Sequence, residues 1–370
     1  MATAIVAGFS SCSNDVEESS PVSSVNMINI GHVNVEGNMV DTRGFATTAT
    51  NASSTITTLQ TWGYDASTDE LYLGESATTG RTASGSGSTW TYSPTQYWPV
   101  NALNFVAVAP AAYAAAGISH ATASNAGVVT LTDNLTLPTD VENQVDLMYA
   151  NQAGITRTTE MGNVPFTFKH ALSQVVFKGR IGTSGAVTKV TIAEISLVNI
   201  NKTGTITYTS SGQWFGGSND QLYGTSSTPA TFTLDASDLE ASVFEVGTGE
   251  GYVSAGAAFD LTTSTNSTKK NAWMMLPQRT AAASGSYKVG DSAPASGAYL
   301  KIRAQLEKDG VVILGNAASD AFYIPLSVNW DRSKKYTYTI EFNGASSLYP
   351  ITFSVASQDW TDASGINLTM

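Results

Sequence analysis

The sequence predicts an all-β protein built from β-sandwiches. Three observations support this fold class: many short runs rich in β-branched and aromatic residues, turns of Gly, Ser and Asn between those runs, and weak helical signals. Since the chain has 370 residues, we expect two domains rather than one.

The strand-like runs extend along the whole chain. They cover residues 34–40, 55–64, 104–110, 127–132, 173–181, 187–199, 204–209, 298–307, 311–314 and 335–342. The last run places Tyr336, Tyr338, Ile340 and Phe342 on one face, because side chains alternate along a strand. One short helix is expected over 234–243 with Asp235 as its N-cap, and exposed loops over 74–88 and 281–297.

The composition excludes partners that need a basic surface. Charged residues make up 13% of the chain, about half the usual share, and the net charge is −12 with a pI of about 4.6. No cluster of basic residues is larger than Lys269-Lys270 or Lys334-Lys335. A protein that binds nucleic acid needs a basic stripe to displace counterions, so neither nucleic acid nor an anionic membrane surface is an expected partner.

The single cysteine, Cys12, follows a run of small and apolar residues. We interpret residues 1–11 as the remainder of a lipoprotein signal peptide, with Cys12 as the lipidation site. No Lys or Arg precedes Arg43, so the basic start of a signal peptide is missing, and an incidental cysteine in a frayed terminus is the alternative. The acidic, polar residues 13–21 then read as a tether, which makes the lipid anchor the only expected contact with a membrane.

Motifs that would carry catalysis or bind a cofactor or metal are lacking in the sequence. The three histidines have no partner at metal-ligand spacing, and we expect His170 to bond to the backbone at a strand end. The carboxylate pairs 235/238 and 359/362 are expected to cap turns, and residues 65–70 hold only part of a calcium loop. The seven tryptophans are expected mostly in the core, and a glycan platform would need several exposed rings on one face.

Several motifs, in order along the chain, resemble the fimbrillin family of Bacteroidetes pilins. They are YWP at 97–99, FVAVAP at 105–110, DLMYA at 146–150, VPFTFKHALS at 164–173, Trp330 before KYTY at 335–338, and VASQDW at 355–360. The resemblance implies two transthyretin-like β-sandwich domains in tandem, export as a lipoprotein to the outer membrane and cell surface, and assembly into a fimbria. It also implies an arginine-specific protease that removes a first strand, and a strand from a neighbouring pilin subunit that replaces it.

Under this resemblance the chain divides into four parts. Residues 1–11 are the residual signal peptide and 12–43 the tether with a removable strand. Residues 44–183 form the N-terminal sandwich and 184–370 the C-terminal sandwich, with the boundary set where Gly-Thr-Ser-Gly interrupts two strand runs.

The two ends of the chain carry the expected assembly sites. Arg43, followed by Gly44, is the first basic residue, and the strand-like residues 25–40 precede it. An ordinary surface arginine is the alternative. At the other end, Ile366, Leu368 and Met370 alternate with polar residues, as a donor strand requires. A strand that pairs within its own domain is the alternative there.

We therefore expect a structural pilus subunit that supports adhesion by polymerising through protease-triggered strand exchange. The alternative is a monomeric surface lipoprotein that binds glycan or another host or bacterial surface ligand. An enzyme is the third hypothesis, and it would need two facing carboxylates in a cleft.

Overall fold

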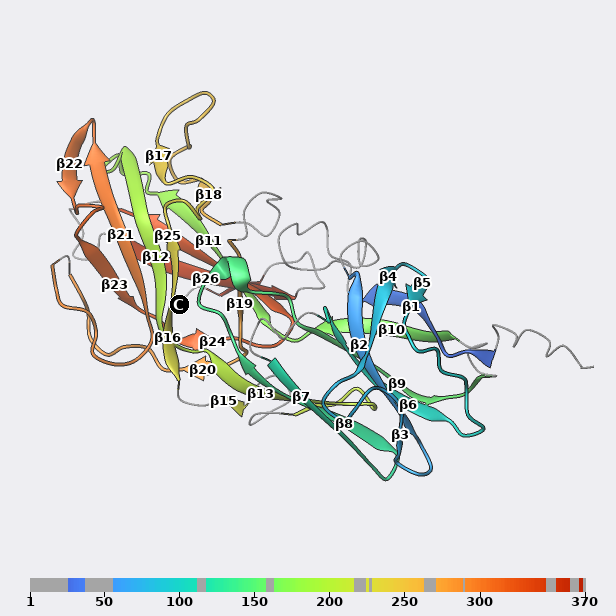
Figure 1. Ribbon diagram of the computed structural model, residues 1–370. Helices are drawn as coiled ribbons and strands as arrows, with labels where there is room; N and C mark the ends of the chain where they lie inside the picture. The colour runs from blue at the N-terminus through green and yellow to red at the C-terminus, as the bar shows by residue number, and fades with distance from the viewer. Residues whose placement is uncertain are drawn as a thin grey trace, which may run out of the picture.

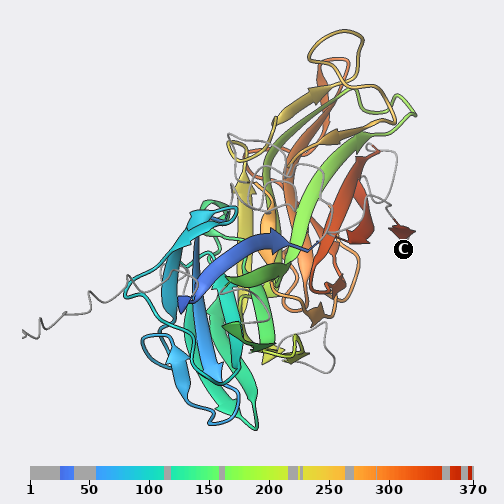
Figure 2. The same ribbon diagram turned by 90° about the vertical axis from the view of Figure 1, so that its right-hand side faces the viewer.

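The computed structural model describes residues 26–36, 56–111, 118–157, 163–215, 224–225, 228–262, 271–288, 290–343, 351–359 and 366–368. Within them the protein is all-β, which confirms the predicted class; a one-turn 3-10 helix, η3 (Val141–Asn143), is the short helical element that interrupts the strands. No helix in this part of the chain is long and apolar enough to cross a membrane. Two groups of sheets lie side by side, the earlier strands in one and most of the later strands in the other (Figures 1 and 2).

The first group contains an eight-stranded and a five-stranded sheet. The larger sheet has the order β1 (Asn29–Val35), β10 (Asn163–His170), β9 (Met148–Ile155), β6 (Leu103–Ala109), β2 (Thr58–Asp65), β4 (Arg81–Ser86) and β5 (Thr89–Thr91), with β3 (Leu71–Leu73) paired to β2. The smaller sheet has the order β14 (Trp214–Phe215), β13 (Thr203–Thr209), β8 (Val128–Thr136) and β7 (Ile118–Asn125), with β15 (Gly224–Thr225) paired to β13.

The second group contains two six-stranded sheets and a short pair. One sheet has the order β18 (Ala258–Asp260), β11 (Ser173–Ile181), β25 (Lys334–Phe342), β26 (Ile351–Asp359) and β27 (Ile366–Leu368), with β19 (Trp273–Met275) on β11. The other has the order β16 (Pro229–Asp235), β12 (Lys189–Asn201), β21 (Tyr299–Lys308) and β22 (Val311–Leu314), with β17 (Val243–Glu245) on β12 and β23 (Ala321–Pro325) on β21. The short pair is β20 (Arg279–Thr280) with β24 (Val328–Asn329).

Strand β6 lies between two hydrophobic cores, and every one of its residues is buried. Phe105 and Ala107 face a core that also holds the apolar side chains of β1 and β10. Val106 and Val108 face a second core, which extends through the five-stranded sheet into the later sheets. A nearly continuous apolar run is typical of a strand that is covered on both faces.

The chain passes between the two groups more than once. β11 pairs with β25 in the second group, β13 returns to pair with β8 in the first, and β16 pairs with β12 in the second. The division at residues 183 and 184 stays a prediction, as does the tandem transthyretin-like arrangement. Strand pairing alone places β11 with the later sheets and β13 with the earlier ones.

The strand predictions are mostly accurate, and two other local predictions are wrong. In β25 the four expected side chains at 336, 338, 340 and 342 are all buried. The helix expected over 234–243 does not form, since Asp235 ends β16 and its carboxylate accepts from the Ser237 N–H at 2.7 Å in a tight turn. The loop expected over 74–88 contains β4, whose small residues allow close pairing with β2.

Gln144, directly after η3, joins the two groups of sheets. Its side chain is fully buried, its amide oxygen accepts from the Met274 N–H of β19 at 2.7 Å, and its amide nitrogen donates to the Pro138 carbonyl at 2.9 Å. Both ends of the amide are therefore satisfied, and the bond to Met274 crosses the junction.

Gln144→Ala should lower the free energy of unfolding by about 1–3 kcal/mol, because the buried Met274 N–H loses its acceptor. Urea denaturation followed by tryptophan fluorescence measures this. Asn143→Ala is the matched control, since Asn143 lies in the same turn with an exposed side chain and should change stability by less than about 0.5 kcal/mol. Equal effects of the two substitutions would contradict a bridging role for Gln144.

Candidate functional site

Strand β1 lies at the edge of the eight-stranded sheet and runs parallel to β10. The aligned pairs are Asn29–Asn163, Ile30–Val164, Val33–Phe166, Asn34–Thr167 and Val35–Phe168, and the ladder continues where the Glu36 N–H donates to the Phe168 carbonyl at 2.7 Å. Figure 2 shows β1, in blue, crossing the face of the first group that is turned toward the viewer. A segment from near the start of the chain therefore completes this sheet.

The pairing of β1 with β10 contains a bulge. Between Ile30 and Val33, the two residues Gly31 and His32 stand opposite the single residue Pro165. Proline has no N–H for a ladder and is found in strands mainly at edges and bulges. A Cβ on Gly31 would lie 3.1 Å from the Cβ of Asn163, so the bulge brings the two strands close at a residue without a side chain.

On its other side, β1 contacts the segment that leads from β4 through β5 to β6. The Val33 N–H donates to the Gly87 carbonyl at 3.3 Å, and the Ile28 N–H donates to the Gln96 carbonyl at 2.8 Å. The Tyr92 hydroxyl donates to the Ile28 carbonyl at 2.5 Å, and burial raises the pKa of Tyr92, which keeps this donor protonated. Strand β1 thus closes the curled sheet by bonding to both of its edges.

Four apolar side chains of the β1 segment fill the core beneath it. Ile28, Ile30, Val33 and Val35 are all buried, whereas His32 on the opposite face is exposed. They pack in one cluster with the aromatic side chains of β6 and β10, where the Phe166 ring lies 6.0 Å from that of Phe168 and 6.4 Å from that of Phe105, measured between centroids. We call the space that β1 occupies, between β10 and residues 87–98, the β1 groove.

The β1 groove has the features of a site that accepts an extended strand. Main-chain groups on both sides supply hydrogen bonds, and alternate side chains of the occupant enter apolar pockets. In this structure the occupant is the chain's own β1, which sits inside the predicted strand region 25–40.

At the other end of the chain, β27 pairs antiparallel with β26. The aligned pairs are Val355–Leu368, Ala356–Asn367 and Ser357–Ile366. Of the predicted donor residues, Ile366 and Leu368 thus lie in a short strand at the edge of their own sheet. The predicted lipidation site Cys12, the processing site at Arg43 and Gly44, and Met370 lie outside the described residues, and these four assignments stay predictions.

Sequence reasoning misjudged the partner of His170. Its Nδ1 lies 2.8 Å from the Asp146 carboxylate rather than against a backbone group, and both side chains are buried. A second buried pair joins His120 to Asp133 at 2.8 Å, and Asp133 also accepts from the Tyr149 hydroxyl. These partners are 24 and 13 residues apart in the chain, so no local motif indicated them.

In the partial calcium loop at residues 65–70, the Asp65 carboxylate already accepts hydrogen bonds from the protein itself. The Asp65 carboxylate accepts from the Asn101 amide at 2.9 Å and from the Ser67 and Thr68 N–H groups at 2.8 and 3.1 Å. These bonds, with that from Asn101 the largest contribution, lower the pKa of Asp65 from 3.8 to about 2. No group of three or more potential metal-ligating side chains occurs among the described residues.

Of the five tryptophans whose side chains the structure describes, four lie in the core, as predicted, and one lies near β1. Trp62, Trp273 and Trp330 are fully buried and Trp90 nearly so, but Trp98 is half-buried at the rim of a pocket.

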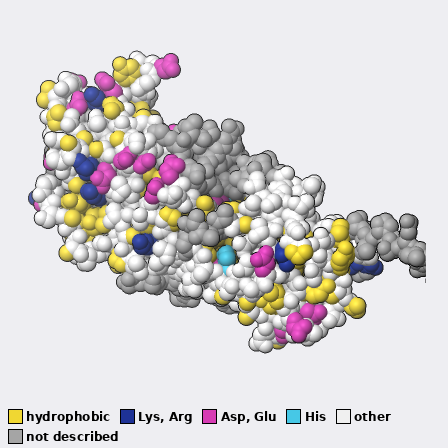
Figure 3. Space-filling model, viewed as in Figure 1, with side chains coloured by type: hydrophobic (Ala, Val, Ile, Leu, Met, Phe, Trp, Pro, Cys, Tyr) yellow, Lys and Arg dark blue, Asp and Glu magenta, His cyan; other side chains and the backbone are white. Residues whose placement is uncertain are grey.

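On the face drawn in Figure 3, basic side chains lie among acidic ones, without a basic stripe.

Asp65→Asn should make the stability of the protein depend less on pH in the acid range. A carboxyl group whose pKa falls on folding stabilises the protein above its ordinary value of 3.8, and this contribution disappears as the pH falls through about 2. The substitution should therefore lower the melting temperature at neutral pH and change it little near pH 2. Melting curves across this range provide the test, with the exposed turn residue Asp309→Asn as control. A parallel shift at every pH would show that the carboxylate charge is not responsible.

Val33→Ala should lower the free energy of unfolding by about 1–3 kcal/mol, because it removes buried methyl groups from the core beneath β1. Limited proteolysis should also cleave the chain before residue 56 faster. His32→Ala changes the exposed face of the same strand and should have little effect on either measurement. If both variants resist denaturant and protease equally, β1 does not contribute to the core as described.

Comparison with known proteins places this geometry in a family. Residues 42–360 match the family described as fimbrillin-like, so the match begins at the residue before Arg43 and covers most of the chain. A search of curated proteins finds no match.

Solved structures of bacterial fimbrial and candidate cell adhesion proteins are similar to this chain. A fimbrial protein from Bacteroides vulgatus is 17% identical, with a TM-score of 0.56 over 91% of this chain and 100% of that one. A candidate cell adhesion protein from Bacteroides ovatus is 11% identical (TM-score 0.46, covering 90% and 97%). The tip fimbrial protein Mfa3 from Porphyromonas gingivalis, truncated at its C-terminus, is 12% identical (TM-score 0.33, covering 89% and 99%). The first of these supports the fold, and the family match shows that the chain belongs to the fimbrillin-like family.

Proposed function

We propose that this protein is a structural pilus subunit that polymerises by exchanging β1 for a strand of a neighbouring subunit. In this proposal the precursor is exported as a lipoprotein through Cys12. An arginine-specific protease then cuts between Arg43 and Gly44, β1 leaves with the segment before the cut, and the β1 groove receives the donor strand. Membership in the fimbrillin-like family supports the coarser role, that of a surface appendage component rather than an enzyme.

The observation that carries the proposal is the position of β1. It is a core strand, it precedes the expected cleavage site, and its ladder with β10 is interrupted by the bulge at Pro165. A cut after β1 would leave the strand attached only by noncovalent contacts.

The energetics explain why the groove would not stay empty. Burying a Val or Ile side chain contributes roughly 1.5–3 kcal/mol, so losing the four β1 side chains from the core costs on the order of 10 kcal/mol. The main-chain groups of β10 and of residues 87–98 would also lose their partners, and an open apolar edge associates with other strands. A strand from a neighbouring subunit would cover the same core and bond to the same main-chain groups, so it would offset both costs.

The spacing of the groove matches the predicted donor strand. The aligned positions on β10 are Val164, Phe166 and Phe168, which are two residues apart. Ile366, Leu368 and Met370 have the same spacing, and strict alternation would let them enter the groove without a bulge. β27 is held by its own sheet over three residue pairs at an edge, so its release costs few main-chain hydrogen bonds.

The next arginine after Arg43 supports selective cleavage. Arg81 lies within β4, its side chain is 12% exposed, and its guanidinium donates to the Ser93 carbonyl at 3.0 Å. A protease needs an accessible, extended segment, so Arg81 is protected as long as the sheet stays folded.

The second candidate is a monomeric surface lipoprotein that binds a ligand. The observation that favours it is the pocket at the start of β1, which would be available without any processing. Assembly after cleavage distinguishes the two candidates.

Treatment of the purified chain with an arginine-specific protease should give a fragment that begins at Gly44, together with filaments. N-terminal sequencing and electron microscopy measure these results. Arg43→Ala should give neither, and Arg81→Ala should behave as the wild type. Mass analysis of the uncut protein from the cell surface tests lipid at Cys12. Normal assembly by Arg43→Ala would overturn the processing step.

A synthetic peptide of residues 26–36 sharpens the test of strand exchange. Added in excess to the cut protein, it should refill the groove, raise the melting temperature and block filament growth. The same peptide with Val33→Asp should do neither, because it places a charge in the apolar core. If the cut protein stays monomeric and keeps β1 bound indefinitely, or if both peptides act alike, strand exchange at this groove is wrong.

A further inference from the structure

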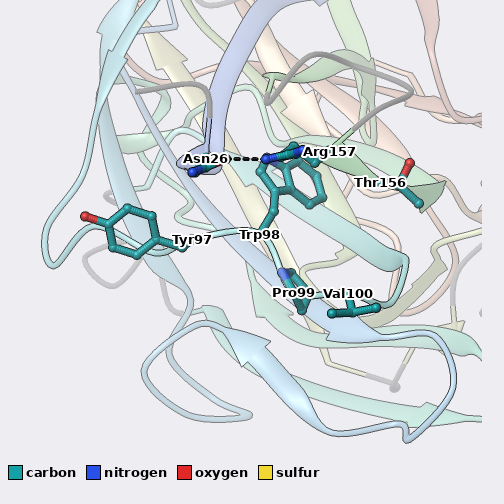
Figure 4. Close-up of a pocket in the computed structure, with 7 residues that line it drawn as sticks. All are labelled: Asn26, Tyr97, Trp98, Pro99, Val100, Thr156 and Arg157. Atoms are coloured by element: carbon teal, nitrogen blue, oxygen red, sulfur yellow. Dashed lines mark hydrogen bonds between the residues drawn. The ribbon is translucent and has the colours of Figure 1, made fainter. Parts of the chain in front are cut away.

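A pocket of about 640 Å³ opens beside the first residue of the described chain. Its walls come from Asn26, from residues 97–100 between β5 and β6, and from Thr156 and Arg157 directly after β9. Figure 4 shows Asn26, Trp98 and Arg157 close together, with Tyr97 directed away from them and Pro99 and Val100 along another wall. This volume lies within the range of roughly 300–1,000 Å³ that is typical of small-ligand sites.

The polar groups in the pocket are mainly hydrogen-bond donors. Arg157 is the one charged residue among its described walls, in a protein whose net charge is −12. Its guanidinium donates to the Asn26 side-chain oxygen, and a guanidinium has five N–H donors, so it can pair with a carboxylate at the same time.

The Trp98 ring lies beside Arg157 and lines the pocket with its exposed part. Its indole nitrogen is buried and has no acceptor among the described residues, so a ligand in the pocket meets the ring and not the N–H. Arg157 and Trp98 together therefore favour a ligand that combines a negative charge with an apolar face.

The apolar walls are held in place although they are exposed. Tyr97 is 44% exposed and Val100 fully exposed. The Tyr97 carbonyl accepts from the Tyr72 hydroxyl at 2.7 Å, and the Trp98 N–H donates to the Asn26 carbonyl at 3.0 Å. These main-chain bonds fix the backbone of the wall, and the half-buried Trp98 ring provides a flat apolar surface on it.

We propose that this pocket binds a sugar that carries a carboxylate, such as a uronic or sialic acid. Arg157 pairs with the carboxylate, and the C–H face of the sugar packs on the exposed part of the Trp98 ring beside it. A peptide strand fits less well, because Met27 already pairs with Tyr97 and leaves no open main-chain edge in the pocket. This proposal does not depend on strand exchange, since it concerns the uncut chain.

Calorimetric titration of the full, uncut chain tests the proposal, with N-acetylneuraminate and glucuronate as probes and galactose and glucose as neutral comparisons. We expect the acids to bind with millimolar dissociation constants and the neutral sugars at least about tenfold more weakly. Added salt should weaken the binding of the acids, because the Arg157 side chain is exposed.

Arg157→Gln should weaken binding of the acids about tenfold or more and remove the preference over neutral sugars. Trp98→Ala should weaken the binding of acids and neutral sugars alike. Lys308→Gln removes the same charge from an exposed site in the second group of sheets and should change neither. Melting temperatures of the variants check that the fold is kept.

Three results would overturn the proposal: equal affinity for acid and neutral sugars, acid binding by Arg157→Gln that equals the wild type, and no binding up to about 50 mM. A wild-type response of Arg157→Gln in the cleavage and filament assay would leave the pilus proposal intact, so the two can fail separately.

Discussion

The structure depends on the closure of the curled eight-stranded sheet by β1. Without this strand, the edge of β10 and residues 87–98 would expose main-chain groups and the core that contains Phe105, Phe166 and Phe168. A sheet edge with an apolar face beneath it must be filled by some strand, and any strand with the right alternation satisfies the same main-chain groups. The stability of the first group of sheets is therefore tied to β1, and under the proposed exchange a neighbouring subunit would supply that strand instead.

The second core holds the sheet to which β1 is paired. Because β6 is buried on both faces, the sheet that holds the β1 groove also packs against β8 and β13, and through them against the later sheets. The passage of the chain from β12 to β13 and back to β16, and the Gln144 amide at the junction, connect the two groups. Loss of β1 would thus affect one core and leave the other in place.

The sequence allows the fold class and most strand positions to be predicted, because alternation and β-branched runs are local signals. Strand β25 is the clearest case, with four alternate side chains buried as expected. The helix expected at 234–243 and the loop at 74–88 were wrong, because turn hydrogen bonds and small-residue strands give weak local signals. The parallel pairing of β1 with β10 joins residues more than 130 positions apart, and no sequence pattern indicates it. The pocket at Trp98 was missed for the same reason, since Arg157 meets Asn26 only through the fold.

The two proposals meet at Asn26. Its side chain accepts from Arg157 and its carbonyl accepts from the Trp98 N–H, so the residue before β1 forms one wall of the pocket. If cleavage removes β1, Asn26 leaves with it, and Arg157 loses an acceptor while the pocket becomes wider. The affinity for an acidic sugar would then differ between the uncut and the assembled chain, because the same guanidinium would be paired in one and open in the other. Strand exchange and ligand binding would thus be coupled through one hydrogen bond at the start of β1.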